Sequence, residues 1–245
     1  MDTQALNGQA REEPPAGNRI PRTAVVRFLV LVLLLVVVPF LAAGRIDWWG
    51  GWAYVILTVL AVVGSRVLIL RFNPDLAAER ATSLQAEGVK RWDRVLVPIV
   101  GQFGPLVTCM VGGLDVRFGW TGRLPFGLQL AGLAFLAAGS AFATWAMVSN
   151  RFFSAMVRIQ TDRGHSVVSA GPYRWIRHPG YAGGILADLA TPLLLGSYWA
   201  LIPGVLTAMV VVLRTALEDR TLLEELPGYT DYARRTRYRL LPGVW

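Results

Sequence analysis

Long apolar runs constrain this chain more than any other feature of its sequence. The run FLVLVLLLVVVPFLAA covers residues 28–43, and further apolar stretches cover about 48–70, 95–114 and 124–148. A helix that spans the hydrocarbon core of a bilayer needs about 20 predominantly apolar residues. Only 16% of the residues are charged, against about 25% in a typical soluble domain. The sequence therefore predicts an all-α, multi-pass transmembrane protein.

The first apolar run has two possible interpretations. It follows Arg27 and ends in the small residues 42–44, as a cleaved signal peptide does. However, further apolar runs follow it directly, and the long polar segment 1–22 precedes it. We therefore predict that 28–43 is a retained membrane helix that follows a disordered tail.

The last apolar stretch, 182–213, is interrupted by GSYW at 196–199. Each half has roughly 15 residues, which is short for a span of about 20. Two short or tilted helices in a hairpin fit this pattern best, and one bent re-entrant element is the alternative. The chain is thus predicted to have about six membrane helices. Beyond residue 213 we expect a helix to about Leu226 and, after Pro227, a second helix that ends before Pro242.

The arrangement of arginine and lysine predicts the orientation. If the N-terminus is cytoplasmic, the inner segments 1–27, 71–94, 149–181 and 214–245 contain 20 of the chain's 24 basic residues. Short cytoplasmic loops carry such an excess. An even number of crossings then places both termini in the cytoplasm. Because the basic residues are nearly all arginine and Ala, Gly and Val are abundant, we expect a bacterial inner membrane.

Three units are predicted along the chain: the tail 1–22, four membrane helices in 23–148, and a functional core in 149–245. The net charge of +8 does not indicate nucleic-acid binding, because the arginines lie between apolar runs. The sequence has no CxxC, HExxH or paired-histidine spacing, so we predict no bound metal. A transporter or scaffold is disfavoured because no repeat symmetry is visible. The oligomeric state is left open.

The segment GPYRWIRHPGY, residues 171–181, suits neither a helix nor lipid. Pro179 disfavours helical geometry at His178, and Gly180 lets the backbone turn freely. We therefore predict a rigid, irregular loop on which polar side chains converge. The alternative, a basic and aromatic loop that contacts lipid headgroups, does not explain the proline and glycine beside His178.

Arg214 and Glu218 lie four residues apart at the end of the last apolar helix. They can form a simple i,i+4 ion pair. Alternatively they have a function, since an ionisable group at the centre of a membrane helix costs about 2.5–3.5 kcal/mol. Glu224 and Glu225 are expected to lie in solvent without a function. Asp219 is intermediate between these two residues and the functional candidates Arg214 and Glu218.

Taken in order, these polar segments resemble the isoprenylcysteine carboxyl methyltransferases, whose general plan the phospholipid methyltransferases share. The resemblance covers about residues 149–245. It rests on NRFFS (150–154), QTDRGHSVV (160–168), GPY (171–173), RHPGY (177–181) and RTALE (214–218).

The resemblance implies a membrane enzyme that takes the methyl group of S-adenosylmethionine. It also implies a cytosolic cofactor pocket closed by the C-terminal helices, with a lipophilic acceptor entering from the bilayer. Arg214 matches a position implied to face the substrate, and we expect catalytic roles for Arg214 and His165. The residues implied or expected to bind the cofactor are Gln160, His165, Ser166, Val167, Val168, Tyr173, Arg177, His178, Pro179, Gly180, Tyr181 and Glu218.

The chemistry of the cofactor is compatible with these residue types. Its α-carboxylate needs donors, which His178, Arg177 or loop amides can supply. Its hydroxyls or ammonium need a carboxylate such as Glu218. Its adenine and sulfonium favour aromatic walls, for which Tyr173 and Tyr181 are candidates.

Methyl transfer from an activated carrier requires mainly alignment of the acceptor and exclusion of water. A carboxylate acceptor needs no base, and Arg214 can orient it. An amine acceptor must lose a proton, for which His165 is the candidate. Arg220 and Thr221 depart from the acidic residues that often follow in this family. The acceptor therefore stays open among prenylated, quinone-like, small-lipid and hydrophobic-acid classes, with a carboxyl group favoured.

A membrane reductase of the steroid or sterol type, which uses NADPH, is the alternative enzyme. Those proteins have a similar His-Pro-x-Tyr segment, with Asn after the Pro and Glu three residues beyond the Tyr. Gly180 and Gly184 stand at these positions here, so the match is poorer.

Overall fold

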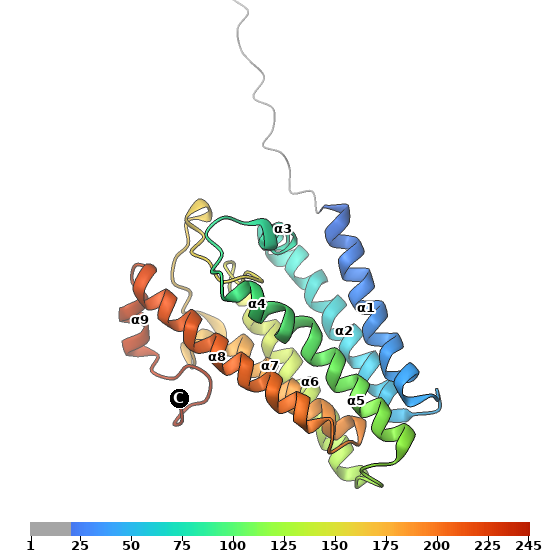
Figure 1. Ribbon diagram of the computed structural model, residues 1–245. Coiled ribbons are helices and arrows are strands. Elements are labelled where there is room, and N and C mark those ends of the chain that lie inside the picture. The colour runs from blue at the N-terminus through green and yellow to red at the C-terminus, as the bar shows by residue number, and fades with distance from the viewer. Residues whose placement is uncertain (1–20) are drawn as a thin grey trace, which may run out of the picture.

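The computed structural model describes residues 21–245, and all of the regular secondary structure in that range is helical, with no strand (Figure 1). Five helical segments are long and apolar enough to cross a membrane: α1 (Arg22–Ala43), α2 (Trp49–Phe72), the unit Asp93–Phe118, α6 (Phe126–Ser149) and α8 (Leu201–Glu225). The shorter helices are α3 (Pro74–Thr82), α7 (Pro179–Leu195) and α9 (Tyr229–Arg235). The predicted all-α, multi-pass membrane fold is confirmed.

The third span is irregular. It consists of α4 (Asp93–Pro98), a π-helical turn at Ile99–Phe103, and α5 (Gly104–Phe118). Prolines 98 and 105 flank this turn and lack the N–H that a regular helix needs, which accounts for the break. Gly104 lies so close to α8 that an added Cβ would be 2.3 Å from the hydroxyl of Thr207. The turn therefore lies beside a close contact between α5 and α8.

Helices α6 and α7 share the most extensive contact in the structure. Gly139 and Gly183 face each other there, and a Cβ added to either would lie 2.6 or 2.5 Å from the carbonyl oxygen of the other. Small residues allow membrane helices such a close approach. Because α7 also packs against α8, this 17-residue helix is enclosed by longer ones (Figure 1).

The predicted interruption at 196–199 is present, since α7 ends at Gly196 with φ 76° and α8 begins at Leu201. The prediction of two equally short halves is wrong. Helix α8 continues without a break for 25 residues to Glu225, because no glycine or proline lies between 205 and 226. The membrane segment and the charged segment after residue 213 are thus one rigid helix.

Two further expectations for the C-terminal half are corrected. The last helix ends at Arg235 rather than near Pro242, because the backbone that follows hydrogen-bonds to residues 177 and 178. The RHPGY segment is irregular only as far as His178, since Pro179 begins α7. Proline is well tolerated at the first position of a helix, where its missing N–H costs nothing.

The core of the bundle lies between α2, α5, α6 and α7 and includes the buried side chains of Tyr54, Cys109, Leu136 and Leu194. A second cluster lies at one end of the bundle, where Ala146, Tyr173, Leu226, Tyr229 and Tyr232 pack together. This second cluster forms part of the wall of the site described below.

The long connecting segments meet at one end of the bundle (Figure 1). The side chain of Asn73 donates to the carbonyl of Val148 at 2.7 Å, and the backbone N–H of Lys90 donates to Val157 at 3.0 Å. Helix α1 also starts at this end. The segments that were predicted to share one side of the membrane therefore lie together. Residues 1–20, most of the predicted tail, are outside the described residues, and Arg22 already belongs to α1.

A candidate active site at one end of the bundle

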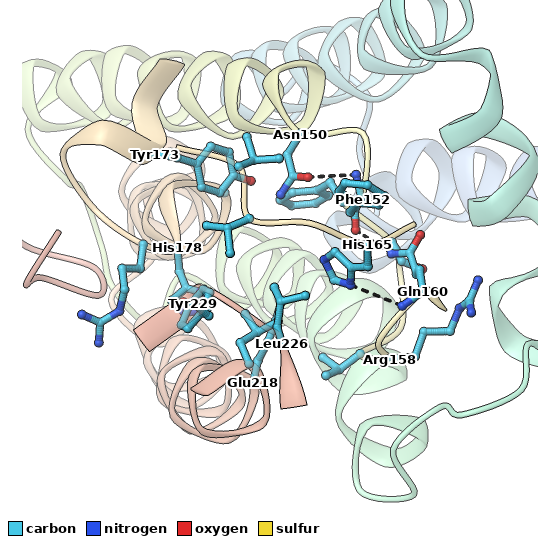
Figure 2. A pocket seen from close by; sticks show the side chains of 18 of the residues that line it. Asn150, Phe152, Arg158, Gln160, His165, Tyr173, His178, Glu218, Leu226 and Tyr229 are labelled. Carbon is cyan, nitrogen blue, oxygen red and sulfur yellow. Dashed lines mark hydrogen bonds between the residues drawn. The ribbon is translucent and has the colours of Figure 1, made fainter. Parts of the chain in front are cut away.

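A pocket opens where the segment 150–178 crosses the ends of α7 and α8 (Figure 2). Its empty space, counted together with the open solvent at its mouth, is about 770 Å³. Figure 2 shows His165 and Gln160 on one side and His178, Glu218 and Tyr229 on the other. Arg214 and every predicted cofactor residue except Pro179 line the pocket.

Asp219 is the central acceptor of the site and is fully buried. Arg177 donates to both of its oxygens at 2.8 Å, and Arg239 and the hydroxyl of Tyr229 donate at 2.7 and 2.9 Å. Nε2 of His178 lies 3.1 Å from the same carboxylate. The carboxylate thus joins the loop, α8 and the C-terminal segment, a role that the sequence did not show.

Arg177 has a structural role in this arrangement. Its Nη1 donates to the carbonyls of Thr236 and Arg237 at 3.0 and 2.7 Å, and its backbone N–H donates to Tyr238 at 2.9 Å. Its guanidinium is therefore engaged with protein groups on each nitrogen. Nδ1 of His178 has no hydrogen-bond partner within residues 21–245, so this ring nitrogen remains available to a ligand.

His165 and Gln160 form the opposite wall. The buried amide of Gln160 donates to the carbonyl of Phe152 at 2.8 Å, and its oxygen accepts from Arg163. The backbone N–H of Gln160 lies 3.3 Å from Nδ1 of His165, which assigns the ring proton to Nε2. Burial, together with the positive charges of Arg163 and Arg158, lowers the pKa of His165 to about 4. This imidazole is therefore neutral at pH 7 and a weak base.

Several polar groups in the pocket have no protein partner. Within the part of the chain that the structure describes, the backbone N–H groups of Ser166, Val167 and Val168 donate to no acceptor. One carboxylate oxygen of Glu218 accepts from the hydroxyl of Tyr181, and the other has no donor there. Donors and an acceptor are therefore free on facing walls of one pocket.

Arg214 does not form the simple pair with Glu218 that was the alternative to a function. Its Nε and Nη2 bind the carboxylate of Asp93 at 2.7 and 3.0 Å, and Nη2 also donates to the carbonyl of Ala155 at 2.9 Å. The guanidinium carbon lies 5.0 Å from the ring centre of Tyr181. The long-range pair with Asp93 aims Arg214 at the pocket.

The two outer glutamates are surface groups, as predicted. Glu224 pairs with the exposed Arg220 at 2.7 Å, and Glu225 pairs with Lys90. Neither glutamate lines the pocket.

Comparison with known proteins identifies the family to which this site is similar. Residues 132–224 match the model of the isoprenylcysteine carboxyl methyltransferase family. The resemblance to this family is confirmed. The matched residues run from α6 into α8 and include most of the pocket's lining; Leu226, Tyr229 and Tyr232 lie beyond the match.

Individual relatives match shorter segments. A protein-S-isoprenylcysteine O-methyltransferase of Schizosaccharomyces pombe is 35% identical over 71 residues, 29% of this chain and 30% of that protein. The uncharacterized protein YpbQ of Bacillus subtilis is 37% identical over 62 residues, 25% of this chain and 37% of that protein. The matches thus span about a third of each relative's length.

Among solved structures, the eukaryotic intramembrane Ras methyltransferase aligns with 86% of this chain and 84% of its own, with a TM-score of 0.47 and 18% identity.

Several residues of this site were not predicted from the sequence. Asp93 had a usable signal, because it is an acidic residue that opens an apolar run. Tyr229 and Tyr232 in α9, whose rings meet edge to face, had none beyond a Tyr-rich composition. The lining residues not predicted from the sequence include Asn150, Phe152, Phe153, Arg158, Leu222, Leu226, Tyr229 and Tyr232.

Gly180 serves a different purpose from the one predicted. It is helical and buried, and an added Cβ would lie 2.6 Å from the ring of Phe153. Its missing side chain makes room for this aromatic ring and is not needed for a turn.

Proposed function

We propose that this protein is an integral-membrane methyltransferase that transfers the methyl group of S-adenosylmethionine to a carboxylate of a lipophilic acceptor. The observation that carries the proposal is the pocket at the end of the bundle where the connecting segments meet. There, backbone donors without protein partners face the one oxygen of Glu218 that has no donor among the described residues. The match of residues 132–224 to a methyltransferase family supports it. The same match gives no support to a reductase.

The free groups suit S-adenosylmethionine. The amides of residues 166–168 are donors for its α-carboxylate or adenine. Nε2 of His178 donates to Asp219, so Nδ1 of the neutral ring is an acceptor for the ammonium, a hydroxyl or the adenine amino group. The free oxygen of Glu218 is an acceptor for its hydroxyls or ammonium. Tyr173 and Tyr181 supply aromatic surface beside them. When bound, this cofactor supplies a methyl group that is already activated, so the protein's contribution is to bind, to orient and to exclude water.

The acceptor is proposed to be a carboxylate. A protonated amine would have to lose a proton before reaction, and His165, with a pKa lowered to about 4, is a poor base for that step. A carboxylate is a nucleophile as it stands, and Arg214 is held where it can orient one. The yeast relative is named for an isoprenylcysteine substrate. Prenylated and other hydrophobic acids are accordingly the classes to test first.

The site is proposed to face the cytoplasm. The segments around it carry most of the chain's basic residues, which short cytoplasmic loops do. Both termini would then be cytoplasmic, in a bacterial inner membrane.

Two measurements on the detergent-solubilised protein test the function. Calorimetric titration is expected to show binding of S-adenosylmethionine and none of NADPH; the reverse result would contradict the proposal. Incubation with the methyl-labelled cofactor and a membrane lipid extract is expected to label a lipophilic product. Mild base should release this label as methanol, because methyl esters hydrolyse and methylamines do not.

A further inference from the structure

Arg80, in α3, is a part-buried cation with no carboxylate partner among residues 21–245. Its Nη1 donates to the carbonyl of Phe153 at 2.9 Å, and its Nε is buried with no hydrogen-bond partner within residues 21–245. The adjacent Glu79 does not compensate it, because Arg158 binds both oxygens of that carboxylate at 3.0 and 2.7 Å. A charge that is partly withdrawn from water and has no counter-ion is costly, although less so than a fully buried one. Such a group suggests that a ligand supplies the anion.

Arg80 lies directly behind the wall of the pocket. Its guanidinium carbon is 5.7 Å from the ring centre of Phe153, and the same ring packs against Gly180. Phe153 and Gly180 both line the pocket. A single aromatic residue therefore connects Arg80 to the site.

The charged groups around Arg80 are mostly positive. Burial, followed by the charges of Arg66 and Arg214, lowers the pKa of Arg80 to about 9, and the hydroxyl of Tyr181 opposes this shift. At that pKa the guanidinium is still protonated at pH 7. Arg214 is matched by Asp93, whereas Arg66 has no ion pair within the described residues. This side of the site therefore carries an excess of positive charge.

We propose that Arg80 provides the uncompensated positive charge that binds the anionic group of the acceptor, with Arg214 as the second guanidinium of the same site. The inference depends on the proposed function for the identity of the acceptor. Arg214 is held and neutralised by Asp93, so it orients the bound group. Arg80 is the cation whose charge an incoming carboxylate would satisfy.

This assignment predicts a preference among amphiphiles. A carboxylate on a long apolar chain should bind, whereas the matching uncharged amide should bind poorly. Arg80 precedes the family-matched region 132–224, so the preference would come from α3, outside that region.

The experiment measures binding to the full-length protein in neutral maltoside micelles at pH 7. The probes are N-acetyl-S-farnesylcysteine and palmitate, each paired with its uncharged carboxamide, and phosphatidylglycerol as a source of lipid phosphate. The variants are Arg80→Met, Arg80→Lys, and Arg91→Gln as the matched control. Arg91 is an exposed arginine in the same connecting segment with no ion pair among the described residues.

Arg80→Met is expected to weaken carboxylate binding by about 10- to 100-fold, the size of one charge-assisted hydrogen bond, with amide binding unchanged. Arg80→Lys should restore much of the loss, and Arg91→Gln should have no effect. Equal carboxylate binding by wild type and Arg80→Met, or no carboxylate binding by either, would overturn the inference. So would an Arg80-dependent response to phosphatidylglycerol alone, which would assign the site to a lipid headgroup.

Affinity for S-adenosylmethionine is measured on the same samples. If the wild type fails to bind it, the proposed function fails, whatever the carboxylates do. If it binds equally to wild type and Arg80→Met while carboxylate binding is also unchanged, only the role of Arg80 is lost.

Discussion

Both ends of the helix bundle contain buried aspartates, but different groups satisfy them. At the end away from the pocket, Asp115 accepts from the backbone N–H of Thr121 at 2.7 Å and from the hydroxyls of Thr121 and Ser197. At the pocket end, Asp93 and Asp219 are bound by arginines. At the end away from the pocket, the neutral groups of Thr121 and Ser197 bind Asp115 and fix the two short connections to which they belong. At the pocket end, the arginines that bind Asp93 and Asp219 bring together segments that are far apart in the sequence.

The difference indicates how a site can be built at a membrane surface. Hydroxyl groups and amides satisfy Asp115 locally and leave no charge directed outward. Arginine has a long side chain and five donors. Arginines from several segments can therefore bind one carboxylate, while the donors that are not bound to it remain free to face the pocket. The charged end should therefore be more sensitive to mutation, and its variants should affect ligand binding as well as stability.

The largest effect is expected for Asp219→Ala. Removing this acceptor leaves Arg177 and Arg239 without their partner, and breaking a buried ion pair costs about 3–5 kcal/mol. Thermal unfolding in detergent should show that loss, and titration with S-adenosylmethionine should show no binding. Retained cofactor affinity would mean that this carboxylate does not organise the pocket.

Replacing both Asp93 and Arg214 tests whether this ion pair serves the acceptor and not the methyl donor. The double variant Asp93→Asn with Arg214→Gln removes both charges together, which avoids leaving one of them buried alone. Acceptor use, measured as kcat/KM, should fall by about 30-fold or more, as expected for lost charge-assisted contacts. The affinity for the methyl donor should change little. An equal loss of kcat/KM for the acceptor and of affinity for the methyl donor would contradict the proposed role of Arg214.

Asp115→Asn is the matched variant at the opposite end. It weakens hydrogen bonds to hydroxyls and an amide, so the free energy of unfolding should fall by about 1–3 kcal/mol. Calorimetric affinity for S-adenosylmethionine should equal that of the wild type. A change in affinity would show that the two ends are coupled.

Acidification should weaken the wall that contains His165. Its pKa in the folded protein is about 4, below the ordinary value of about 6.5. The stabilisation from burying the neutral ring is therefore complete above pH 6.5 and is lost as the pH falls towards 4. The loss by pH 5 should be about 1 kcal/mol, after allowance for solvent screening of this part-exposed ring. Unfolding of wild type and His165→Gln, compared at pH 7.5 and pH 5, should show the difference; parallel curves would contradict the assignment.

The smallest effect is expected for Glu224→Gln. This residue pairs only with the exposed Arg220, and such pairs contribute about 0–1 kcal/mol. Unfolding and ligand affinity should both match the wild type. A large effect would place the outer end of α8 within the site.

Much of the architecture follows from local pattern. Apolar length located the first four membrane segments to within about six residues. Gly196 and Pro227 lie at the ends of α7 and α8, whereas Pro179, which was predicted to belong to an irregular loop, begins α7. The ordered motifs also indicated most of the pocket residues, because each motif is a short segment whose residue types reflect its own chemistry.

The partners of those residues could not be predicted in the same way. Arg214 was expected either to pair with Glu218, four residues away, or to bind a ligand. In the structure it binds Asp93 on another helix. Arg177 was expected to bind the carboxylate of the cofactor. Its guanidinium instead donates to Asp219 and to the backbone carbonyls of Thr236 and Arg237. Nothing in either segment alone distinguishes these outcomes.

By itself, the sequence determined that the chain is a helical membrane protein and which polar segments gather at one end, because bilayer thickness and the cost of burying charge act on each segment separately. Only the tertiary structure decided which arginine each aspartate holds, and which donors remain free for a ligand. Ion pairs and hydrogen bonds depend on distances of a few ångströms between elements, and these distances are established only when the helices have packed.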